Sequence, residues 1–399
     1  MKLNLCVFTS TRADFGLLKP LLKKIAVSNT FNLQLFVTGS HLDQKYGYTI
    51  DEVSADFSSF IKYKVPIELG VIDAKSSLVT MANCLKSYAE EISNSKPDIV
   101  LVLGDRFETF MFSIVCAQFR IPIVHIHGGE VSLGALDDKF RNAITKLSEL
   151  HLTSCDVHAG RVMQMGEESE RVKNVGALGV ENALTVKKLS KPDLLQQLSI
   201  VNFENYFIIT FHPETSVGDF GLSILKAFLL KLDLFLKSRA DFYILFTGVN
   251  HDLGSDKIEF EIKKFISDHN SRSSYILSLG SERYLSAVQN ATAVIGNSSS
   301  GLFEAHSLRT PAVILGRRQL GRESERSVIH LTDDEDIRNF DFSTLIQTKN
   351  EMTLIKNLNS RFGGVDVSNN IMIELENFIK SNIYKRPKTF TDFRFSGDL

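Results

Sequence analysis

The chain has 399 residues, 43% of them hydrophobic, and is long enough to bury two ordinary cores. Its 45 basic and 47 acidic residues give a formal net charge of −2, which excludes a global attraction to nucleic acid or to an anionic membrane. Any anion-binding site must therefore be local.

The N-terminal stretch MKLNLCVFTSTRAD alternates like a strand before it turns polar, and it has no small-residue cleavage site of a secretory signal. No run approaches the roughly 18 to 20 apolar residues that a membrane span needs. Cys6, Cys84, Cys116 and Cys155 lie far apart and form no C-x-x-C pair. These features predict a protein of the reducing cytoplasm.

Short β-rich runs alternate along the chain with segments long enough for a helix. In chain order the predicted strands are 3–9, 33–38, 61–65, 98–104, 121–126, 206–211, 242–248, 275–280, 292–297 and 311–316. Continuous apolar strands between helices indicate parallel sheets that are covered on both faces. The polar stretch 183–205 lacks this rhythm and predicts a linker with a small helix, whereas helical spacing in 369–386 predicts a final helix.

This pattern predicts an α/β protein of two doubly wound, Rossmann-like domains that face each other across a cleft. We expect an N-terminal domain over 1–182, a C-terminal domain over 183–368, and a helix and tail over 369–399 that pack back on the first domain. Ligands of such sheets bind outside the carboxyl ends of the strands. The polar residues that directly follow predicted strands are therefore the candidate site residues: Arg12, His41, Asp105, the turn 125–130, His212 and the loop 296–301.

The stretch VIGNSSSGLFEAHSL leads from a strand through small hydroxyl residues into a helix, whose free N–H groups favour an anion. The alternative is ordinary capping, with Ser298 or Ser299 as N-cap and Glu304 completing a capping box. Arginines after other strands favour phosphate binding: Arg12, Arg317, Arg318, Arg322 and Arg326. Neither a P-loop nor a dinucleotide fingerprint is present.

Acids and histidines gather after the fourth and fifth predicted strands. Asp105 either caps the next helix or acts as an acid–base group in the cleft. Glu130, Asp137 and Asp138 follow a Gly-Gly turn, and we expect one of the two aspartates to be only a helix cap. These groups predict acid–base chemistry, which needs groups on different sides of one bound molecule.

The histidines divide by position. His125 continues the strand alternation as a core histidine would, whereas His127 lies at the turn, where its side chain can meet substrate. His212 precedes Pro213, which restricts the backbone before it. His125 and His127 are the only pair with close spacing, and a strand would point them to opposite faces, so we expect no metal site.

The ordered set of motifs resembles the hydrolysing UDP-N-acetylglucosamine 2-epimerases, in the branch that begins sialic-acid synthesis. The matching stretches are TSTRADFGLLKPLL, VTGSHL, LVLGDRFE, HIHGGEVSLGALDDKFRNAITKLSELH, VGALGVEN, ITFHPET, GNSSSGLFEA and RRQLGRESE. The resemblance implies a glycosyltransferase-B type fold. It also implies elimination of UDP to leave a glycal, which water converts to N-acetylmannosamine without a cofactor or metal.

The same resemblance implies roles for individual residues. Asp105 and Asp137 match acid–base positions, and His212 matches a sugar-contacting histidine. The substrate-binding set comprises Arg12, His41, Arg106, Gly296, Asn297, Ser298, Ser299, Ser300, Gly301, Glu304, Arg318 and Arg322. Many relatives carry Glu where this chain has His127, so either His127 shuttles the proton itself or Glu130 serves in its place.

The resemblance implies a UDP-sugar as the small-molecule partner and a homodimer or homotetramer. The nearest alternative is a sister epimerase of UDP-2,4-diacetamido-2,4,6-trideoxyglucose, for legionaminic-type sugars. A glycosyltransferase on the same architecture would need an acceptor groove, and a non-catalytic nucleotide-sugar sensor would have no use for acids around the sugar. Turnover without an acceptor excludes both of these.

Overall fold

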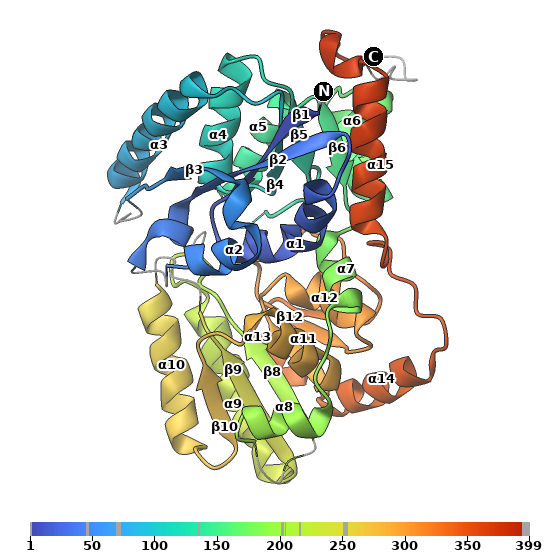
Figure 1. Ribbon diagram of the computed structural model, residues 1–399. Helices are drawn as coiled ribbons and strands as arrows, with labels where there is room; N and C mark the ends of the chain where they lie inside the picture. Colours follow the sequence, from blue (N-terminus) through green and yellow to red (C-terminus); the bar gives the residue numbers. More distant parts are fainter. Residues whose placement is uncertain are drawn as a thin grey trace, which may run out of the picture. The chain divides into compact units, whose positions relative to one another are not determined.

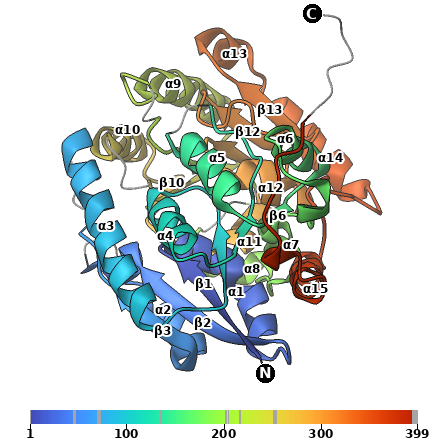
Figure 2. The same cartoon turned by 90° about the horizontal axis from the view of Figure 1, so that it is seen from above.

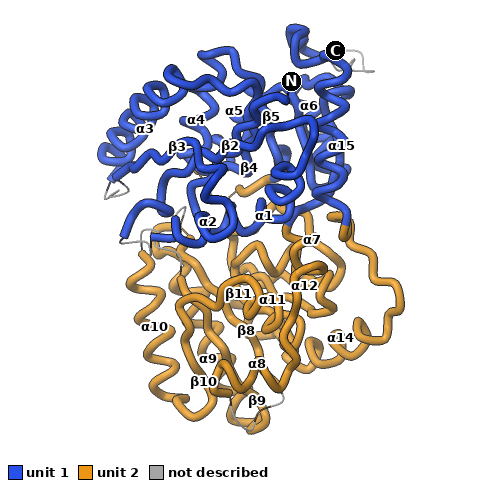
Figure 3. The backbone as a smooth tube through the Cα atoms, viewed as in Figure 1, with its two compact units in different colours: residues 1–130, 137–178, 366–399 blue, residues 131–136, 179–365 orange. Residues whose placement is uncertain are grey.

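The computed structural model describes residues 2–44, 48–68, 73–133, 136–200, 203, 205–214, 217–249 and 254–392 (Figure 1). They form two compact units, of which unit 1 comprises 1–130, 137–178 and 366–399, and unit 2 comprises 131–136 and 179–365 (Figure 3). The segment 131–136 therefore packs with unit 2, although the chain on both sides of it belongs to unit 1. Within the described ranges, no helix is long and apolar enough to cross a membrane.

Unit 1 is built on a seven-stranded sheet in the order β3-β2-β1-β4-β5-β6-β7. Its strands are β1 (Leu3–Thr9), β2 (Phe31–Thr38), β3 (Ile61–Val65), β4 (Ile99–Leu103), β5 (Ile123–Ile126), β6 (Leu150–Thr153) and β7 (Val172–Asn174). All neighbours pair in parallel, and the order reverses between β1 and β4, so the loops after these two strands lie at the topological switch point. The sequence pattern predicted five of these strands but not the short β6 and β7.

Helices cover both faces of this sheet. They are α1 (Arg12–Ala26), α2 (Ile50–Phe57), α3 (Ala74–Asn94), α4 (Phe107–Gln118), α5 (Asp137–Leu147), α6 (Asp156–Gln164) and α15 (Val367–Lys380). Leu5 and Val7 point into a core with α1 and α15, while Cys6 and Phe8 point into a core with α3 and α4. Alternate residues of β1 thus supply opposite cores, as the two-residue period of a strand requires. Figure 2 shows α3 and α15 on opposite sides of β1.

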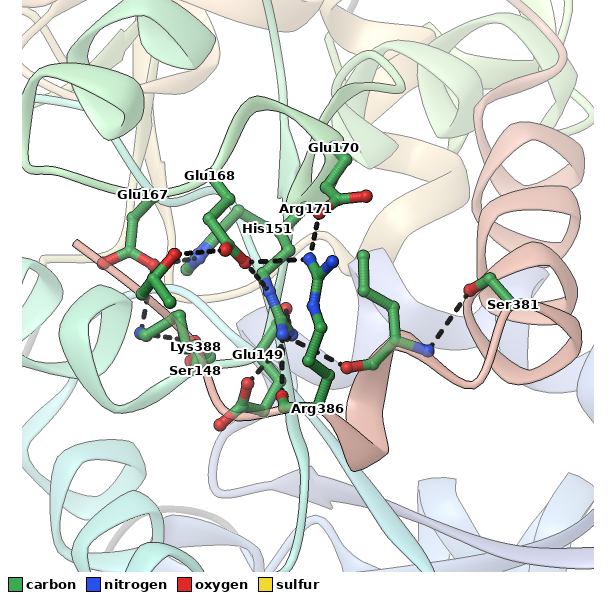
Figure 4. Close-up of polar contacts among 12 residues, drawn as sticks. Ser148, Glu149, His151, Glu167, Glu168, Glu170, Arg171, Ser381, Arg386 and Lys388 are labelled. Carbon is green, nitrogen blue, oxygen red and sulfur yellow. Dashed lines mark hydrogen bonds and ion pairs between the residues drawn. The ribbon is translucent and has the colours of Figure 1, made fainter. Parts of the chain in front are cut away.

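Buried charged side chains bind the segment after α15 to the rest of unit 1 (Figure 4). The fully buried Arg171 donates from Nη2 to the carbonyl oxygens of Ile383 at 3.1 Å and Arg386 at 2.9 Å. Lys388 Nζ lies 3.0 Å from Oε2 of Glu167, whose side chain is buried. Because removal of one partner would leave the other charge buried, these contacts hold the segment to the unit. Residues 393–399 of the predicted tail lie outside the described residues.

Unit 2 contains a six-stranded sheet in the order β10-β9-β8-β11-β12-β13. Its strands are β8 (Asn205–Thr210), β9 (Phe242–Thr247), β10 (Ser273–Ile276), β11 (Ala293–Gly296), β12 (Ala312–Leu315) and β13 (Val328–Leu331). These pairs are also parallel, and the order reverses between β8 and β11. The predicted strand 275–280 was wrong in its second half, because β10 ends at Ile276 and Gly280 already begins a helix.

The helices of unit 2 are α7 (Leu178–Thr185), α8 (Lys191–Gln197), α9 (Leu222–Ser238), α10 (Ser255–Asp268), α11 (Gly280–Asn290), α12 (Ser300–Ser307), α13 (Asp334–Asn339) and α14 (Ser343–Leu354). Phe207 and Ile209 of β8 pack with α9 and α10, while Tyr206 and Ile208 pack with α8 and α11. The small helix predicted in 183–205 is α8, and residues 201, 202 and 204 of that stretch lie outside the described residues. The two units are thus two parallel α/β domains, as predicted.

Candidate active site

The chain bends sharply where β5 ends. His127 has φ +67° and Gly129 has φ +79°, both in the left-handed region. A Cβ atom on Gly129 would lie 2.3 Å from the carbonyl oxygen of His158, so only glycine can occupy this position. The bend predicted at Gly128-Gly129 is present. It also holds His127 in the left-handed backbone conformation, which residues other than glycine rarely adopt.

His125 and His127 differ although one residue separates them. His125 is fully buried, with Nε2 2.8 Å from the carbonyl oxygen of Gly104 and Nδ1 3.2 Å from Oγ1 of Thr145. Burial lowers the pKa of His125 to about 3. His125 is therefore a neutral core histidine with both ring nitrogens in use.

His127 contacts the carboxylate of Glu130. Its Nδ1 lies 3.2 Å from Glu130 Oε1, and its buried Nε2 has no hydrogen-bond partner among the described residues. Ser154 Oγ donates to the same carboxylate oxygen at 3.2 Å. The turn therefore holds an imidazole and a carboxylate together. One imidazole nitrogen contacts the carboxylate, and the other has no partner among the described residues.

Asp105 follows β4 and forms an ion pair with Arg141 of α5. The N-cap of α4 is Arg106, so the interpretation of Asp105 as a helix cap was wrong. Arg141 is buried and also donates from Nη1 to the carbonyl oxygen of Glu130 at 2.9 Å. One guanidinium thus positions the loop after β4 and the loop after β5.

Asp137 is the first residue of α5, and Asp138 is the second, so both aspartates lie inside the first turn and not at the N-cap. Burial, and then the neighbouring charge of Asp105, raise the pKa of Asp137 to about 6, although Arg106 opposes this shift. Arg106 itself forks onto the buried carboxylate of Glu108, at 3.2 Å and 3.1 Å. A carboxyl with a pKa near 6 can give or take a proton close to neutral pH.

The turn after β1 is filled by its own carboxylate. Asp14 Oδ2 accepts hydrogen bonds from the backbone N–H of Ser10 at 3.1 Å and of Thr11 at 3.0 Å, within a capping box. Arg12 is exposed at the start of α1. This helix end is therefore already occupied by an anion.

His41 supports that turn from the end of β2. It is fully buried, with Nε2 3.0 Å from Thr9 Oγ1 and Nδ1 2.8 Å from Thr49 Oγ1. Burial lowers its pKa, and the charge of Asp14 opposes the shift. The structure places His41, predicted as a substrate contact, inside unit 1 with both nitrogens bonded.

In unit 2 the ends of β8 and β11 are joined by a reciprocal pair. The backbone N–H of His212 donates to Asn297 Oδ1, and Asn297 Nδ2 donates to the carbonyl oxygen of His212, both at 2.7 Å. Burial, and then the charge of Arg318, lower the pKa of His212 to about 3. His212 is therefore a neutral imidazole at the switch point of this sheet.

The turn between β11 and α12, called the open turn below, has Leu302 and no carboxylate at its third helical position. Its first N–H groups bond within the turn, Ser300 to Ser298 Oγ at 3.5 Å and Leu302 to the Ser299 carbonyl oxygen at 2.9 Å. The N-cap is Ser299, and its side chain makes no capping hydrogen bond, so the alternative of a capping box with Glu304 was wrong. Gly296 has φ +137°, and a Cβ atom there would lie 1.9 Å from the carbonyl oxygen of Thr210. The tight approach of two strands thus sets the path of this turn, which leaves Ser298, Ser299, Ser300 and Gly301 around the start of the helix.

Glu214 organises the arginine loop after β12. Its Oε1 accepts from the backbone N–H of Arg317 at 2.8 Å and of Arg318 at 3.1 Å. Gly316, at φ +72°, packs so closely that a Cβ atom would lie 2.3 Å from the same oxygen. Arg318 Nη1 also reaches the carbonyl oxygen of Asn297 at 3.3 Å, which ties this loop to the open turn.

Arg322 binds the segment 131–136. Its Nε and Nη2 donate to Ser132 Oγ at 3.1 Å and 2.8 Å. Arg326 is exposed. Arg318 thus has a direct hydrogen bond to the loop 296–301.

Sequence reasoning missed Asp14, Arg141, Ser154 and Glu214. The signal for Arg141 was present, because it stands three residues before the buried Ile144 on the apolar side of α5, where a cation requires a buried partner. Asp14 could have been found as the last residue of a Thr-x-x-Asp capping pattern. Within the described ranges, no group of three or more His, Cys, Asp or Glu side chains could hold a metal ion.

Comparisons with known proteins agree with these features. Residues 23–376 match the family model described as UDP-N-acetylglucosamine 2-epimerase. The chain is 36% identical over 392 residues to the polysialic acid biosynthesis protein P7 of Escherichia coli, which covers 96% of this chain and 95% of that protein. It is 34% identical over 340 residues to the hydrolyzing GDP/UDP-N,N'-diacetylbacillosamine 2-epimerase of Campylobacter jejuni, which covers 85% and 86%.

Among solved structures, the UDP-GlcNAc 2-epimerase of Neisseria meningitidis bound to UDP-GlcNAc matches with a TM-score of 0.74 and 20% identity, over 94% of this chain and 100% of that one. At this identity the match shows the fold, which is of the glycosyltransferase-B type. The extent of the family match and the relatives above 30% identity also show the family. The chain belongs to the UDP-N-acetylglucosamine 2-epimerase family.

Proposed function

We propose that this protein is a hydrolysing 2-epimerase that converts UDP-N-acetylglucosamine and water to UDP and N-acetylmannosamine, for sialic-acid synthesis. The observation that carries the proposal is the set of proton-carrying groups after β4 and β5, above all Asp137, whose pKa burial and Asp105 raise to about 6. The name of the P7 relative, a polysialic acid biosynthesis protein, supports the pathway.

The first half of the proposed reaction is an elimination. A base in unit 1 takes the proton from C2 of the sugar, the C–H electron pair forms the C1–C2 double bond, and the C1–O bond breaks toward UDP. The second half adds water, with hydroxide to C1 and a proton to C2 on the face opposite to the one first deprotonated. Asp105, Asp137, His127 and Glu130 are the proposed proton carriers, because two faces need different groups.

Unit 2 supplies the groups that suit a diphosphate leaving group. UDP is a weak base, so positive charge and N–H donors favour its departure without a general acid. The open turn at Ser299 and Ser300, the start of α12 and the Arg318 guanidinium are of this kind. We assign sugar contact to the neutral His212, since it lies beside Asn297 at the switch point.

The test is incubation with UDP-N-acetylglucosamine alone in D2O, followed by NMR. We expect UDP and N-acetylmannosamine that carries deuterium at C2, because elimination discards the original proton and hydration takes one from solvent. Protium retained at C2 would contradict the elimination route. No turnover without an added acceptor would favour a glycosyltransferase or a sensor.

A second candidate substrate is the 2,4-diacetamido-trideoxy sugar nucleotide. The Campylobacter relative, named a diacetylbacillosamine 2-epimerase, favours it. The two substrates differ at C4, where the hydroxyl is replaced by an acetamido group, and at C6, where loss of the hydroxyl leaves a methyl group. A site that hydrogen-bonds those hydroxyls discriminates strongly against the analogue. Parallel assays with both sugar nucleotides, compared by kcat/KM, decide between them.

A further inference from the structure

A buried chain of hydrogen-bonding groups leads from His127 away from the bend. Glu130 Oε1 lies 3.2 Å from His127 Nδ1 and also 3.2 Å from Ser154 Oγ. Ser154 Oγ in turn lies 2.8 Å from Nδ1 of His158, on α6. Glu130, Ser154 and His158 are all at most 5% exposed, so bulk water does not compete for these contacts.

Counting hydrogens fixes the direction of every contact in this chain. The buried Arg141 guanidinium, which donates to the Glu130 carbonyl oxygen at 2.9 Å, favours the ionised carboxylate, and an ionised carboxylate only accepts. Ser154 has a single hydroxyl proton, which goes to Glu130, so His158 Nδ1 must carry the hydrogen that Ser154 accepts. By the same count, Nδ1 of His127 carries a hydrogen toward Glu130.

In neutral His127 the lone pair therefore resides on Nε2. That atom is buried and has no hydrogen-bond partner within the described part of the chain. His125 provides an internal comparison, because its two nitrogens are both taken by Gly104 and Thr145. Buried polar atoms without partners are rare in native proteins, and this one ends a chain that orients it.

We propose that His127 and Glu130 form a catalytic dyad in which His127 Nε2 removes the C2 proton, and that Ser154 and His158 are positioning residues that hold Glu130. This inference rests on the proposed function. In the step, the proton moves from C2 to Nε2, and the C–H pair becomes the C1–C2 double bond as the C1–O pair leaves with UDP. Glu130 stays ionised and stabilises the imidazolium.

The tautomer of His127 tests the dyad without any substrate. In protein labelled with 15N-histidine, at a pH where His127 is neutral, NMR should show a hydrogen on Nδ1 and none on Nε2. The signal is identified by its loss in His127→Asn. Asn tolerates the left-handed backbone at this position, so the variant should fold. A hydrogen found on Nε2 of neutral wild-type His127 would overturn the proposal.

Kinetics test the positioning residues. Ser154→Ala should lower kcat about 10-fold with KM little changed, since it removes one hydrogen bond to a charged group. The matched control is Ser113→Ala, which removes a buried hydroxyl that donates within its own helix to the Thr109 carbonyl oxygen. His158→Asn keeps a donor near the Nδ1 position and should retain most activity, whereas His158→Leu should match Ser154→Ala. Equal kcat in the two serine variants would overturn the positioning role.

The base itself is tested by His127→Asn, which keeps a donor toward Glu130 but lacks Nε2. Its kcat should fall about 100-fold or more, the usual scale for a lost general base, while UDP affinity is retained. Unchanged kcat would remove His127 from the reaction. If the wild-type protein turned over neither sugar nucleotide, the proposed function would fail, and the tautomer measurement would still decide the hydrogen bonding of the pair.

Discussion

Two turns of this protein look alike in sequence and differ in what they can bind. Each leads from the end of a strand at a switch point, through small hydroxyl residues, into a helix: FTSTRAD after β1 and IGNSSSG after β11. In the first, Asp14 at the third helical position accepts the hydrogen bonds of the turn. In the second, the same position holds Leu302, and the N-cap Ser299 makes no side-chain capping hydrogen bond.

The difference teaches that a strand–hydroxyl–helix pattern does not by itself define an anion site. A carboxylate at the third position satisfies the free N–H groups and adds the charge that a phosphate would bring. Leu302 is buried and brings no such charge, so the two turns differ in charge and not in free N–H groups. In the proposed function, unit 2 binds the diphosphate and unit 1 carries out proton transfer, and the following variants test that division.

The largest expected effect is on turnover, from Asp105→Asn in unit 1. Because Asp105 is an acid–base group in the proposed reaction, kcat should fall by roughly 10²-fold or more while UDP affinity is unchanged. The control is Asp98→Asn, at the opposite end of β4, where Asp98 accepts a hydrogen bond from the backbone N–H of Asn4 at 2.7 Å. A variant that lost UDP affinity together with turnover would break the division between the units.

The next effect is on UDP affinity, from Ser299→Asp in unit 2. This change places a carboxylate at the N-cap, so it should convert the open turn into a filled one like that at Asp14. Repulsion of the diphosphate should weaken UDP binding by about 30- to 100-fold, on the scale of several kcal/mol for like charges brought together. Ser299→Ala, which removes no capping bond, should change the affinity much less. Calorimetric titration with UDP measures both, and equal affinities would move the anion site elsewhere.

Asp137→Asn should raise stability as it lowers turnover. The pKa of Asp137 is raised from 3.8 to about 6, so the folded state holds this proton more tightly than the unfolded state does. Stability is therefore lost as pH rises from about 4 to about 6, and Asn removes that loss. The variant should exceed the wild type by about 1 to 3 kcal/mol at pH 7 and by little at pH 4.

Urea unfolding at the two pH values measures this difference. The same stability gap at pH 4 and pH 7 would show that the change acts through packing, not through the proton. A parallel loss of turnover would show that a group unfavourable for stability is kept for the reaction.

The smallest effect is expected from removal of the Asp14 carboxylate in the turn after β1. Asp14→Ala should lower the free energy of unfolding by about 1 to 2 kcal/mol, because it removes the carboxylate of a capping box. It should not create a second UDP site, since Arg12 alone would remain. Asp51→Ala, an exposed acid in the first turn of α2, is the control and should change stability little. A second equivalent of UDP bound to Asp14→Ala would contradict the comparison.

Much of the fold could be predicted from the sequence. Long apolar runs such as that of β4 can only be buried on both faces, and their alternation with helices predicts two parallel sheets. The strands that were missed, β6, β7 and β13, have three or four residues. Strands of four residues such as β11 and β12 were predicted because they are apolar throughout, whereas His151, Lys173 and His330 interrupt the missed ones. Neighbours in the sheet then decide the conformation of such mixed runs.

The sequence by itself also determined which residues follow strand ends, and hence that Asp105, His127, Asp137, His212 and the serine loop belong to candidate site loops. It could not distinguish a cap from a working group, because that depends on contacts between residues far apart in the chain. Only the tertiary structure paired Asp105 with Arg141, gave His125 two partners, and joined His127 to Glu130. The physical reason is that burial and neighbouring charge set the state of each polar group, and both are properties of the packed fold.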